Sequence, residues 1–341
     1  MESKDIKDVS YEALGVLLTQ WGAPRFLAKQ IFAWLYQKGV RDFKQMSDVS
    51  LEWRAKLAET FVSSNASVKQ EQSSFDGTRK ILLTLRDKAC VEAVMIPVLS
   101  RATGCLSTQV GCKFKCAFCA SGVGGFKRNL SAGEILEEAL CIQERAPGKK
   151  LTNVVFMGTG EPFDNYDALL QSIRIINASQ GMGIGARHIT ISTCGIVPGI
   201  QRLAQEGLQV ELCVSLHATD ERTRSAILPV NRAYPLRELM AACRAYVRKT
   251  GRQVTFEYVL IKDFNCSLKN AQDLVTLCKG FDSKINLIPF NPVTHSAFLP
   301  PGKIEALYFQ DVLRKAGIPV TFRRPRGRDI DAACGQLLSL R

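Results

Sequence analysis

Strand-like and helix-like segments alternate after about residue 104, and this alternation constrains the fold more than any other feature of the sequence. It is typical of a parallel sheet covered by helices, hence of an α/β protein. The predicted strands are 106–110, 153–157, 188–193, 210–216, 254–261, 285–290 and 319–322. The predicted helices are one that begins after residue 131 and others near 166–178, 198–206, 235–249, 268–279 and 303–315. Six or more such units predict a partial or complete β/α barrel.

The segments before residue 99 have a different character. Residues 1–62 are predicted to form a small helical domain, in which Gly39 is a helix stop and Ser50 caps a later helix. In residues 63–98, the apolar runs 81–85 and 91–96 predict strands of a short antiparallel β extension or linker. The barrel is then expected to occupy residues 99–341.

Composition and charge narrow the class of protein. No apolar run is long enough to cross a bilayer, and the first residues lack a secretory signal, so a cytoplasmic protein without membrane contact is expected. Twelve cysteines in a reducing compartment favour metal ligands, catalytic thiols and buried apolar residues over structural disulfides. The net charge of +13 favours a polyanionic partner, most often nucleic acid, although a basic protein without such a partner stays possible.

Cys112, Cys116 and Cys119 form a CxxxCxxC triplet directly after the first predicted barrel strand. Iron–sulfur clusters normally take four protein thiolates. With three, one iron would stay open to the amine and carboxylate of S-adenosylmethionine (SAM). Zinc is the main metal alternative, but it prefers a second short-spaced pair of ligands, which the sequence lacks.

Polar residues and glycines recur where the predicted strands end. Because the carboxyl ends of parallel strands share one edge of a barrel, they are candidates for a common ligand site. The candidates are Gly160, Glu161, Ser192, Ser215, His217 and Asn291. Singly, each is more often a turn or cap residue, or a structural histidine in the case of His217.

The C-terminal segment combines arginines with an isolated cysteine. Arg323, Arg324, Arg326 and Arg328 suit phosphate binding, with a solvated basic loop as the alternative. Cys334 follows this segment beside small residues, and nearby positive charge favours the thiolate of a nucleophile.

At these positions the chain resembles the RlmN/Cfr family of radical SAM RNA methyltransferases, and most closely its RlmN members, which methylate C2 of adenine. The resemblance covers nearly the whole chain. It lies in the segments 25–46, 105–119, 160–162, 215–217, 286–292 and 329–336, the last of which (Asp-Ile-Asp-Ala-Ala-Cys-Gly-Gln) is highly specific. It implies a partial (β/α)6-type radical SAM barrel with a helical N-terminal domain that helps to bind RNA.

The resemblance also implies site residues. Cys112, Cys116 and Cys119 would bind a 4Fe–4S cluster. The positions that would contact SAM are Gly160, Glu161, Ser192, Ser215, Leu216, His217 and Asn291. Cys334 would be the cysteine that becomes methylated, Cys105 the second catalytic cysteine, and Glu92 the general base.

The implied chemistry uses two SAM molecules per turnover. One methylates Cys334, and the other, reduced through the cluster, gives a 5′-deoxyadenosyl radical that activates the S-methyl group for addition to adenine C2. Glu92 would then remove the C2 proton, and Cys105 would attack Cys334, leaving a transient disulfide. The implied substrates are 23S rRNA at the peptidyl transferase centre and tRNA at the adenosine 3′ of the anticodon. A monomer with a flavodoxin-type electron donor is expected.

Two departures and three alternatives accompany this hypothesis. Thr159 stands where the family usually has methionine, and Ala93 where it has threonine, which leaves substrate fine-tuning open. A Cfr-like C8 methyltransferase has nearly the same residues, although Pro162 favours the RlmN side. A non-catalytic, metal-stapled RNA-binding protein would leave Glu92, Cys105 and Cys334 without a role. A radical SAM activase of a protein partner would explain the triplet, but not Cys334, the arginines before it or the N-terminal domain.

Overall fold

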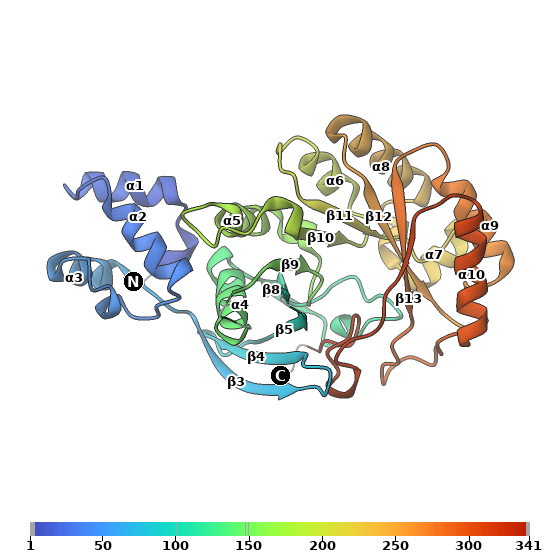
Figure 1. The fold of residues 1–341 in the computed structure, drawn as a ribbon, viewed down its shortest axis with the longest axis horizontal. Helices are drawn as coiled ribbons and strands as arrows, with labels where there is room; N and C mark the ends of the chain where they lie inside the picture. The colour runs from blue at the N-terminus through green and yellow to red at the C-terminus, as the bar shows by residue number, and fades with distance from the viewer. Residues whose placement is uncertain (1–3, 100, 147, 149, 339–341) are drawn as a thin grey trace.

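The structure is a computed structural model that describes residues 4–99, 101–146, 148 and 150–338. Its main body is a ten-stranded sheet with the order β14-β13-β12-β11-β10-β9-β6-β5-β4-β3. The strands of this sheet are β3 (Ala66–Ser73), β4 (Arg79–Leu85), β5 (Cys90–Val98), β6 (Arg101–Cys105), β9 (Asn153–Phe156), β10 (Ile189–Thr193), β11 (Glu211–Ser215), β12 (Val254–Leu260), β13 (Ser283–Pro289) and β14 (Val320–Phe322). Neither edge strand pairs with the other, so the sheet is curved but open (Figure 1).

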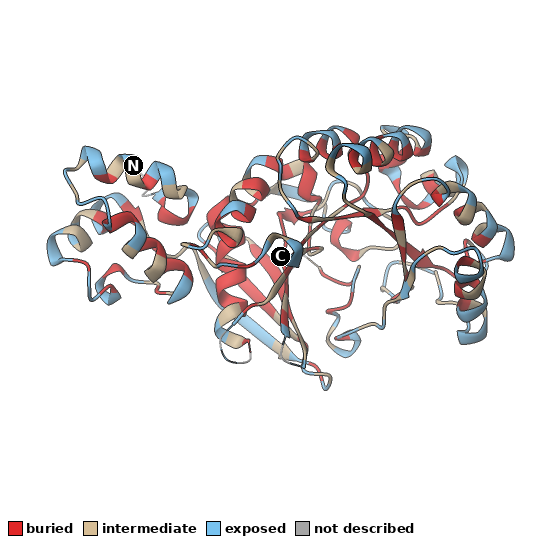
Figure 2. Ribbon diagram, turned by 45° about the horizontal axis from the view of Figure 1, so that its top comes forward, coloured by how far each residue is buried: buried red, intermediate tan, exposed pale blue. Residues whose placement is uncertain are grey.

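Strands β6 and β9 to β14 pair in parallel, and helices connect most of them. The helices of this part are α4 (Ala132–Arg145), α5 (Tyr166–Asn177), α6 (Val197–Leu203), α7 (Glu221–Ile227), α8 (Leu236–Thr250), α9 (Leu268–Cys278) and α10 (Lys303–Lys315). They cover the outer face of the sheet, and their buried sides face it (Figure 2). The partial β/α barrel predicted from the alternation is therefore confirmed. The short helix α7 was not among the predicted helices, although Asp220 accepts the Thr223 amide and so caps it.

Local boundary signals account for several helix ends. Ser131 and Glu134 form the complete capping box at the start of α4. Gly251 ends α8 in the left-handed conformation, with φ of 64°, as a C-terminal glycine does. Ser50 accepts a hydrogen bond from the Trp53 amide and so caps the helix that follows it.

The predicted strand 106–110 is wrong. The first barrel strand is β6, which ends at Cys105 and pairs with β9 from Thr103 to Cys105. After it the chain leaves the sheet, because the Glu138 carboxylate on α4 accepts the Ser107 amide at 2.8 Å. Residues 109–111 instead form β7 (Gln109–Gly111), which pairs with β8 (Phe126–Asn129) in a separate two-stranded sheet.

Strands β3, β4 and β5 pair antiparallel, as expected for the segment 63–98. They do not form a sheet of their own, because β5 also pairs antiparallel with β6 and so continues the barrel sheet. The Asp76-Gly77 turn joins β3 to β4, with Gly77 at φ of 84°.

The N-terminal residues form a helical unit beside α4 and α5 (Figure 1). It contains α1 (Tyr11–Gln20), α2 (Leu27–Phe32) and α3 (Leu51–Thr60), and β1 (Lys4–Asp5) pairs with β2 (Phe61–Val62) to close it. Apolar side chains such as Leu14, Ile31 and Leu57 fill its interior.

Candidate active site

Two adjoining cavities lie at the carboxyl ends of the parallel strands. The main cavity, lined by the cysteine triplet and the ends of β9 to β13, has a volume of about 980 Å³ including its open mouth. The side cavity, about 640 Å³, is lined by Cys105, Arg323 and the residues around Ala333. Five residues line both cavities: Met157, Ile288, Asn291, Cys334 and Leu337. Both volumes include space that is open to solvent.

The structure brings most of the predicted site residues together. Those that line the main cavity are Cys112, Cys116, Cys119, Gly160, Glu161, Ser192, Ser215, His217, Asn291 and Cys334. Those that line the side cavity are Cys105, Arg323, Arg324, Arg326, Asn291 and Cys334. Glu92, Leu216 and Arg328 line neither cavity.

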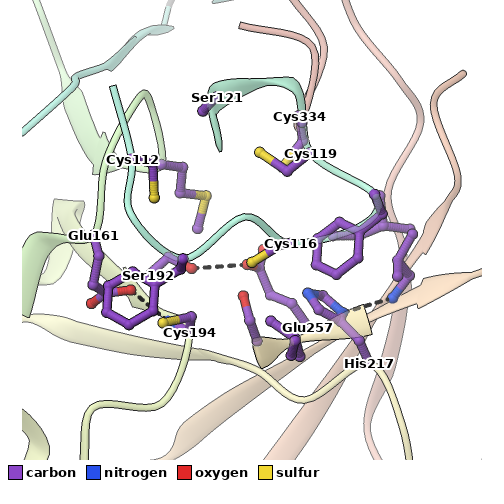
Figure 3. A pocket seen from close by; sticks show the side chains of 18 of the residues that line it. Cys112, Cys116, Cys119, Ser121, Glu161, Ser192, Cys194, His217, Glu257 and Cys334 are labelled. Atoms are coloured by element: carbon purple, nitrogen blue, oxygen red, sulfur yellow. Dashed lines mark hydrogen bonds between the residues drawn. The ribbon is translucent and has the colours of Figure 1, made fainter. Parts of the chain in front are cut away.

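The cysteine triplet lies on the loop between β7 and β8, at one wall of the main cavity (Figure 3). Two backbone hydrogen bonds fix this loop: the Ala117 amide donates to the Ile227 carbonyl at 3.0 Å, and the Ala120 amide donates to the Gly335 carbonyl at 2.7 Å. The second bond holds the triplet against the segment that contains Cys334.

Burial raises the pKa of the Cys112 thiol to about 12, and the backbone amide of Phe114 opposes that shift. Burial, followed by the charges of Cys119 and Cys112, raises the pKa of Cys116 well above its ordinary value. Because repulsion among the thiolates adds to the cost of burial, their ionised forms need a bound cation. The described part of the chain contains no three His, Cys, Asp or Glu side chains grouped as a single metal ion requires.

Glu161 is held rigidly below the triplet (Figure 3). Its carboxylate accepts the Cys194 amide at 2.7 Å and the Phe163 amide at 3.0 Å, and burial raises its pKa. Gly160, at φ of 106°, comes so close to Gln109 that an added Cβ would lie 2.6 Å from the Gln109 Cβ. Only glycine fits there, so the turn is built for close backbone packing.

Glu257 on β12 is a cavity residue that the sequence reasoning missed. Its Oε2 accepts the Ser192 hydroxyl at 3.0 Å, while the Arg323 guanidinium lies 3.6 Å from Oε1. Among the described residues, Oε1 has no hydrogen-bond partner, and neither has the Asn291 Oδ1. A carboxylate among the mostly apolar residues of β12 is the sequence feature that could have identified Glu257 as a site residue.

His217 is held as a neutral ring. Its Nδ1 accepts the Val259 amide at 3.0 Å, and its ring meets Phe118 edge-on at a centroid distance of 4.7 Å. Burial and then the charge of Arg224 lower its pKa to about 3. At neutral pH it can accept or donate hydrogen bonds but carries no charge.

Cys334 lies at the boundary between the cavities. The residue as a whole is exposed, and the Asn291 side-chain amide donates to its carbonyl oxygen at 3.0 Å. Desolvation of the thiol by the protein atoms around it raises its pKa to about 11, although Arg323 opposes this shift. Arg323 therefore supplies the positive charge that was expected to favour the thiolate, but desolvation of the thiol has the larger effect on its pKa.

Cys105, at the end of β6, is buried in the wall of the side cavity. Burial and then the charge of Cys334 raise its pKa to about 12. Glu92 pairs with Lys80 at 3.2 Å and accepts the Leu338 amide at 2.8 Å, so it contacts the C-terminal segment behind the cavities. All twelve cysteines are free thiols.

These features fit a cluster with SAM better than a closed single-ion site. Three thiols line one side of the cavity. Glu257 and Asn291 also line it, and among the described residues one side-chain oxygen of each has no hydrogen-bond partner. Cys112, Cys116 and Cys119 would hold such a cluster.

Comparison with known proteins identifies the class. Residues 106–273 match the family model described as "Radical SAM superfamily", and residues 4–62 match "Ribosomal RNA large subunit methyltransferase N-terminal domain". The barrel is therefore that of a radical SAM protein. No helix in the described part of the chain is long and apolar enough to span a membrane.

Individual relatives define the family. The chain is 45% identical over 334 residues to a "Probable dual-specificity RNA methyltransferase RlmN" of Thermoanaerobacter sp. (strain X514), covering 98% of this chain and 97% of that protein. It is 44% identical to a protein of the same name from Halalkalibacterium halodurans, with coverages of 97% and 92%. The crystal structure of a radical SAM methyltransferase from Sphaerobacter thermophilus superposes with a TM-score of 0.95 at 44% identity, covering 99% of this chain and all of the other. The chain belongs to the RlmN family of radical SAM RNA methyltransferases, which uses SAM and a 4Fe–4S cluster.

Proposed function

We propose that this protein methylates C2 of adenosine in 23S rRNA and in tRNA, through an S-methylated Cys334. The observation that carries the proposal is the position of Cys334, which lines both the cavity of the cysteine triplet and the cavity that holds Cys105 and three arginines. A thiol placed there can receive a methyl group on one side and deliver it to a base on the other.

The main cavity would bind SAM. Gly160, Glu161, Ser192, Ser215, His217 and Asn291 line it, and Leu216, between Ser215 and His217 in the chain, is also a proposed contact. A bound cluster would supply the electron that cleaves one SAM, and a second SAM per turnover would methylate Cys334. Neutral His217 and the free Asn291 oxygen suit the hydroxyls and ring nitrogens of a nucleoside.

The side cavity would bind the target adenosine, turned out of its stack. Cys105 in its wall would attack Cys334 at the end of the reaction, forming a transient disulfide and releasing the product. Glu92 would remove the C2 proton, and its contact with the Leu338 amide would have to break for it to reach the base. Arg324 and Arg326, exposed at the rim, would bind flanking phosphates, with Arg328 beside them.

Residues 1–62 would help to bind folded RNA, as a domain distinct from the β extension 63–98 and the barrel 99–341. We propose a monomer that receives electrons from a flavodoxin-type donor. The domain division rests on the helical unit packing its own apolar interior.

Nucleoside mass spectrometry tests the proposal. Unmodified 23S rRNA fragment and unmodified tRNA are treated separately with anaerobically reconstituted protein, SAM and a reductant. We expect 2-methyladenosine from the wild type and none from Cys334→Ala. Cys278→Ala, a cysteine outside both cavities, is the matched control and should retain the product.

Other products would redirect the assignment. 8-Methyladenosine would move the protein to Cfr-like chemistry. No methylated adenine from either RNA, despite SAM cleavage, would reject the proposed substrate. A preparation that binds zinc and cleaves no SAM would favour the non-catalytic RNA-binding alternative.

A further inference from the structure

A basic surface surrounds the cysteine triplet on the outside of its loop. Lys113 follows Cys112 directly, Lys115 precedes Cys116, and Lys127 lies on β8. We name this surface the lysine patch and define it as Lys113, Lys115, Val123, Phe126 and Lys127. All five side chains are exposed, including the apolar Val123 at 56% and Phe126 at 41%.

Two close approaches bring together the backbone segments that carry the lysine patch. An added Cβ on Gly122 would lie 2.8 Å from the Lys115 Cα, so the turn that carries Lys115 packs directly against the segment before Val123. Pairing of β7 with β8 sets Gly111 opposite Phe126, which brings Phe126 beside the start of the triplet. The backbone segments that carry these lysines and apolar residues are therefore in contact.

The charge of the lysine patch is only partly neutralised. Lys113 pairs with Asp164. Within the described residues, neither Lys115 nor Lys127 forms an ion pair. Exposed charges beside exposed apolar side chains are typical of a surface that meets a partner transiently.

The lysine patch is separate from the arginines of the side cavity. The Gly327 amide and Arg326 contact Asp76 in the turn before β4, at 3.1 Å and 3.9 Å. Arg128, next to Lys127, contacts Asp87 in the turn after β4 at 2.7 Å. β4 has seven residues, so a strand of roughly 20 Å separates the Arg326 contact from the Arg128 contact next to Lys127.

We propose that the lysine patch docks an acidic one-electron donor protein of low potential. A donor seated there lies one residue from two of the three thiolates, and electron transfer requires such proximity. Redox partners commonly bury less than about 1,200 Å² and depend on charge for their encounter rate, so a small patch suffices. One electron leaves the reduced donor and enters the oxidised cluster, and no covalent bond forms or breaks. The inference rests on the proposed function in taking the triplet to hold a cluster.

The test compares two electron sources on the reconstituted full chain. The variant is Lys115→Glu with Lys127→Glu, and a neutral version with glutamine at both positions should give an intermediate effect. The matched control is Lys249→Glu with Lys279→Glu, which changes charge equally. These exposed lysines lie at the carboxyl ends of α8 and α9, which lead to the amino ends of β12 and β13, whereas the cavities lie at the carboxyl ends of the strands.

At low salt, we expect the rate constant for cluster reduction by reduced flavodoxin to fall about tenfold in the variant and to depend less on salt. Direct binding of flavodoxin should weaken in parallel. Iron content, reduction by dithionite and RNA affinity should match the wild type, as should every readout of the control.

Three results would overturn the inference: unchanged reduction by flavodoxin, an equal loss with dithionite, or lost RNA affinity with normal reduction by flavodoxin. The last result would make the lysine patch an RNA surface. The reduction assay contains no RNA, so the two proposals fail separately. Charge-dependent reduction without methyladenosine would reject the proposed function alone, and methyladenosine with unchanged reduction would reject the docking surface alone.

Discussion

At the scale of single residues, Arg224 organises the strand ends that form the main cavity. It has no exposed surface, and its guanidinium donates to the carbonyls of Cys194 at 2.8 Å, Ser215 at 3.1 Å and Leu216 at 3.2 Å. A further bond at 2.7 Å reaches the Asn231 side chain. Burial lowers the pKa of Arg224, so these contacts are needed to keep a charge inside the protein.

Replacing Arg224 by methionine should therefore destabilise the fold. Three carbonyls that end β10 and β11 would lose their shared donor, at a cost of about 3–5 kcal/mol. Chemical denaturation of the apoprotein measures this, with Arg222→Met as the control because Arg222, two residues away, is exposed. Equal stability of the two variants would show that the buried contacts contribute little.

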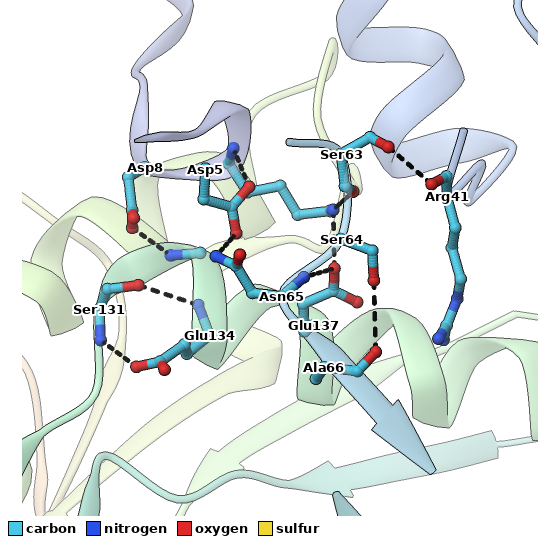
Figure 4. Close-up of polar contacts among 12 residues, drawn as sticks. Asp5, Asp8, Arg41, Ser63, Ser64, Asn65, Ala66, Ser131, Glu134 and Glu137 are labelled. Atoms are coloured by element: carbon cyan, nitrogen blue, oxygen red, sulfur yellow. Dashed lines mark hydrogen bonds and ion pairs between the residues drawn. The ribbon is translucent and has the colours of Figure 1, made fainter. Parts of the chain in front are cut away.

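At the scale of elements, a buried polar cluster joins the N-terminal unit to α4 (Figure 4). The fully buried Lys7 pairs with Glu137 of α4 at 2.8 Å and also contacts the Ser63 carbonyl. Asp5 accepts the Lys7 amide at 2.8 Å and contacts Asn65, while burial raises its pKa to about 6. Because breaking such a pair leaves a buried charge, the cluster fixes how the unit sits on the barrel.

The raised pKa of Asp5 predicts a pH-dependent stability. The folded state binds a proton more tightly than the unfolded state, so the contribution of Asp5 is full below pH 4 and is lost as pH rises through 6. Relative to Asp5→Asn, the wild type should gain about 1.3 kcal/mol between pH 7 and pH 5. Denaturation of both proteins at the two pH values measures this, and a difference that does not change with pH would contradict it.

At the scale of the whole molecule, positive charge dominates. The net charge of +13 would attract RNA over a distance, and the exposed Arg324 and Arg326 place part of it at the side cavity. Phosphate contacts release counterions, so RNA affinity should fall steeply with salt.

With about five phosphate contacts, raising salt from about 50 to 200 mM should weaken tRNA binding about 100-fold. Replacing Arg324 and Arg326 by glutamine should make the dependence shallower, by about 0.7 in the log–log slope for each lost contact. Filter binding or fluorescence anisotropy measures the slope, with Lys249→Gln as the control. The same slope in all three proteins would place the RNA elsewhere.

The sequence by itself determined the order of the barrel elements and the chemistry of the triplet. Strand–helix alternation depends on local periodicity, and the spacing of Cys112, Cys116 and Cys119 is set by covalent connection. Capping at Ser50 and Ser131 is equally local, since each side chain bonds an amide three residues away.

Only the tertiary structure decided which distant residues share a cavity. Glu257 and Arg224 became visible through burial and through contacts between strands that are far apart in sequence. The same holds for the early end of β6, because the bond that turns the chain away comes from Glu138 on α4. Such contacts depend on how the sheet curves and which side chains then meet, and no local pattern contains that information.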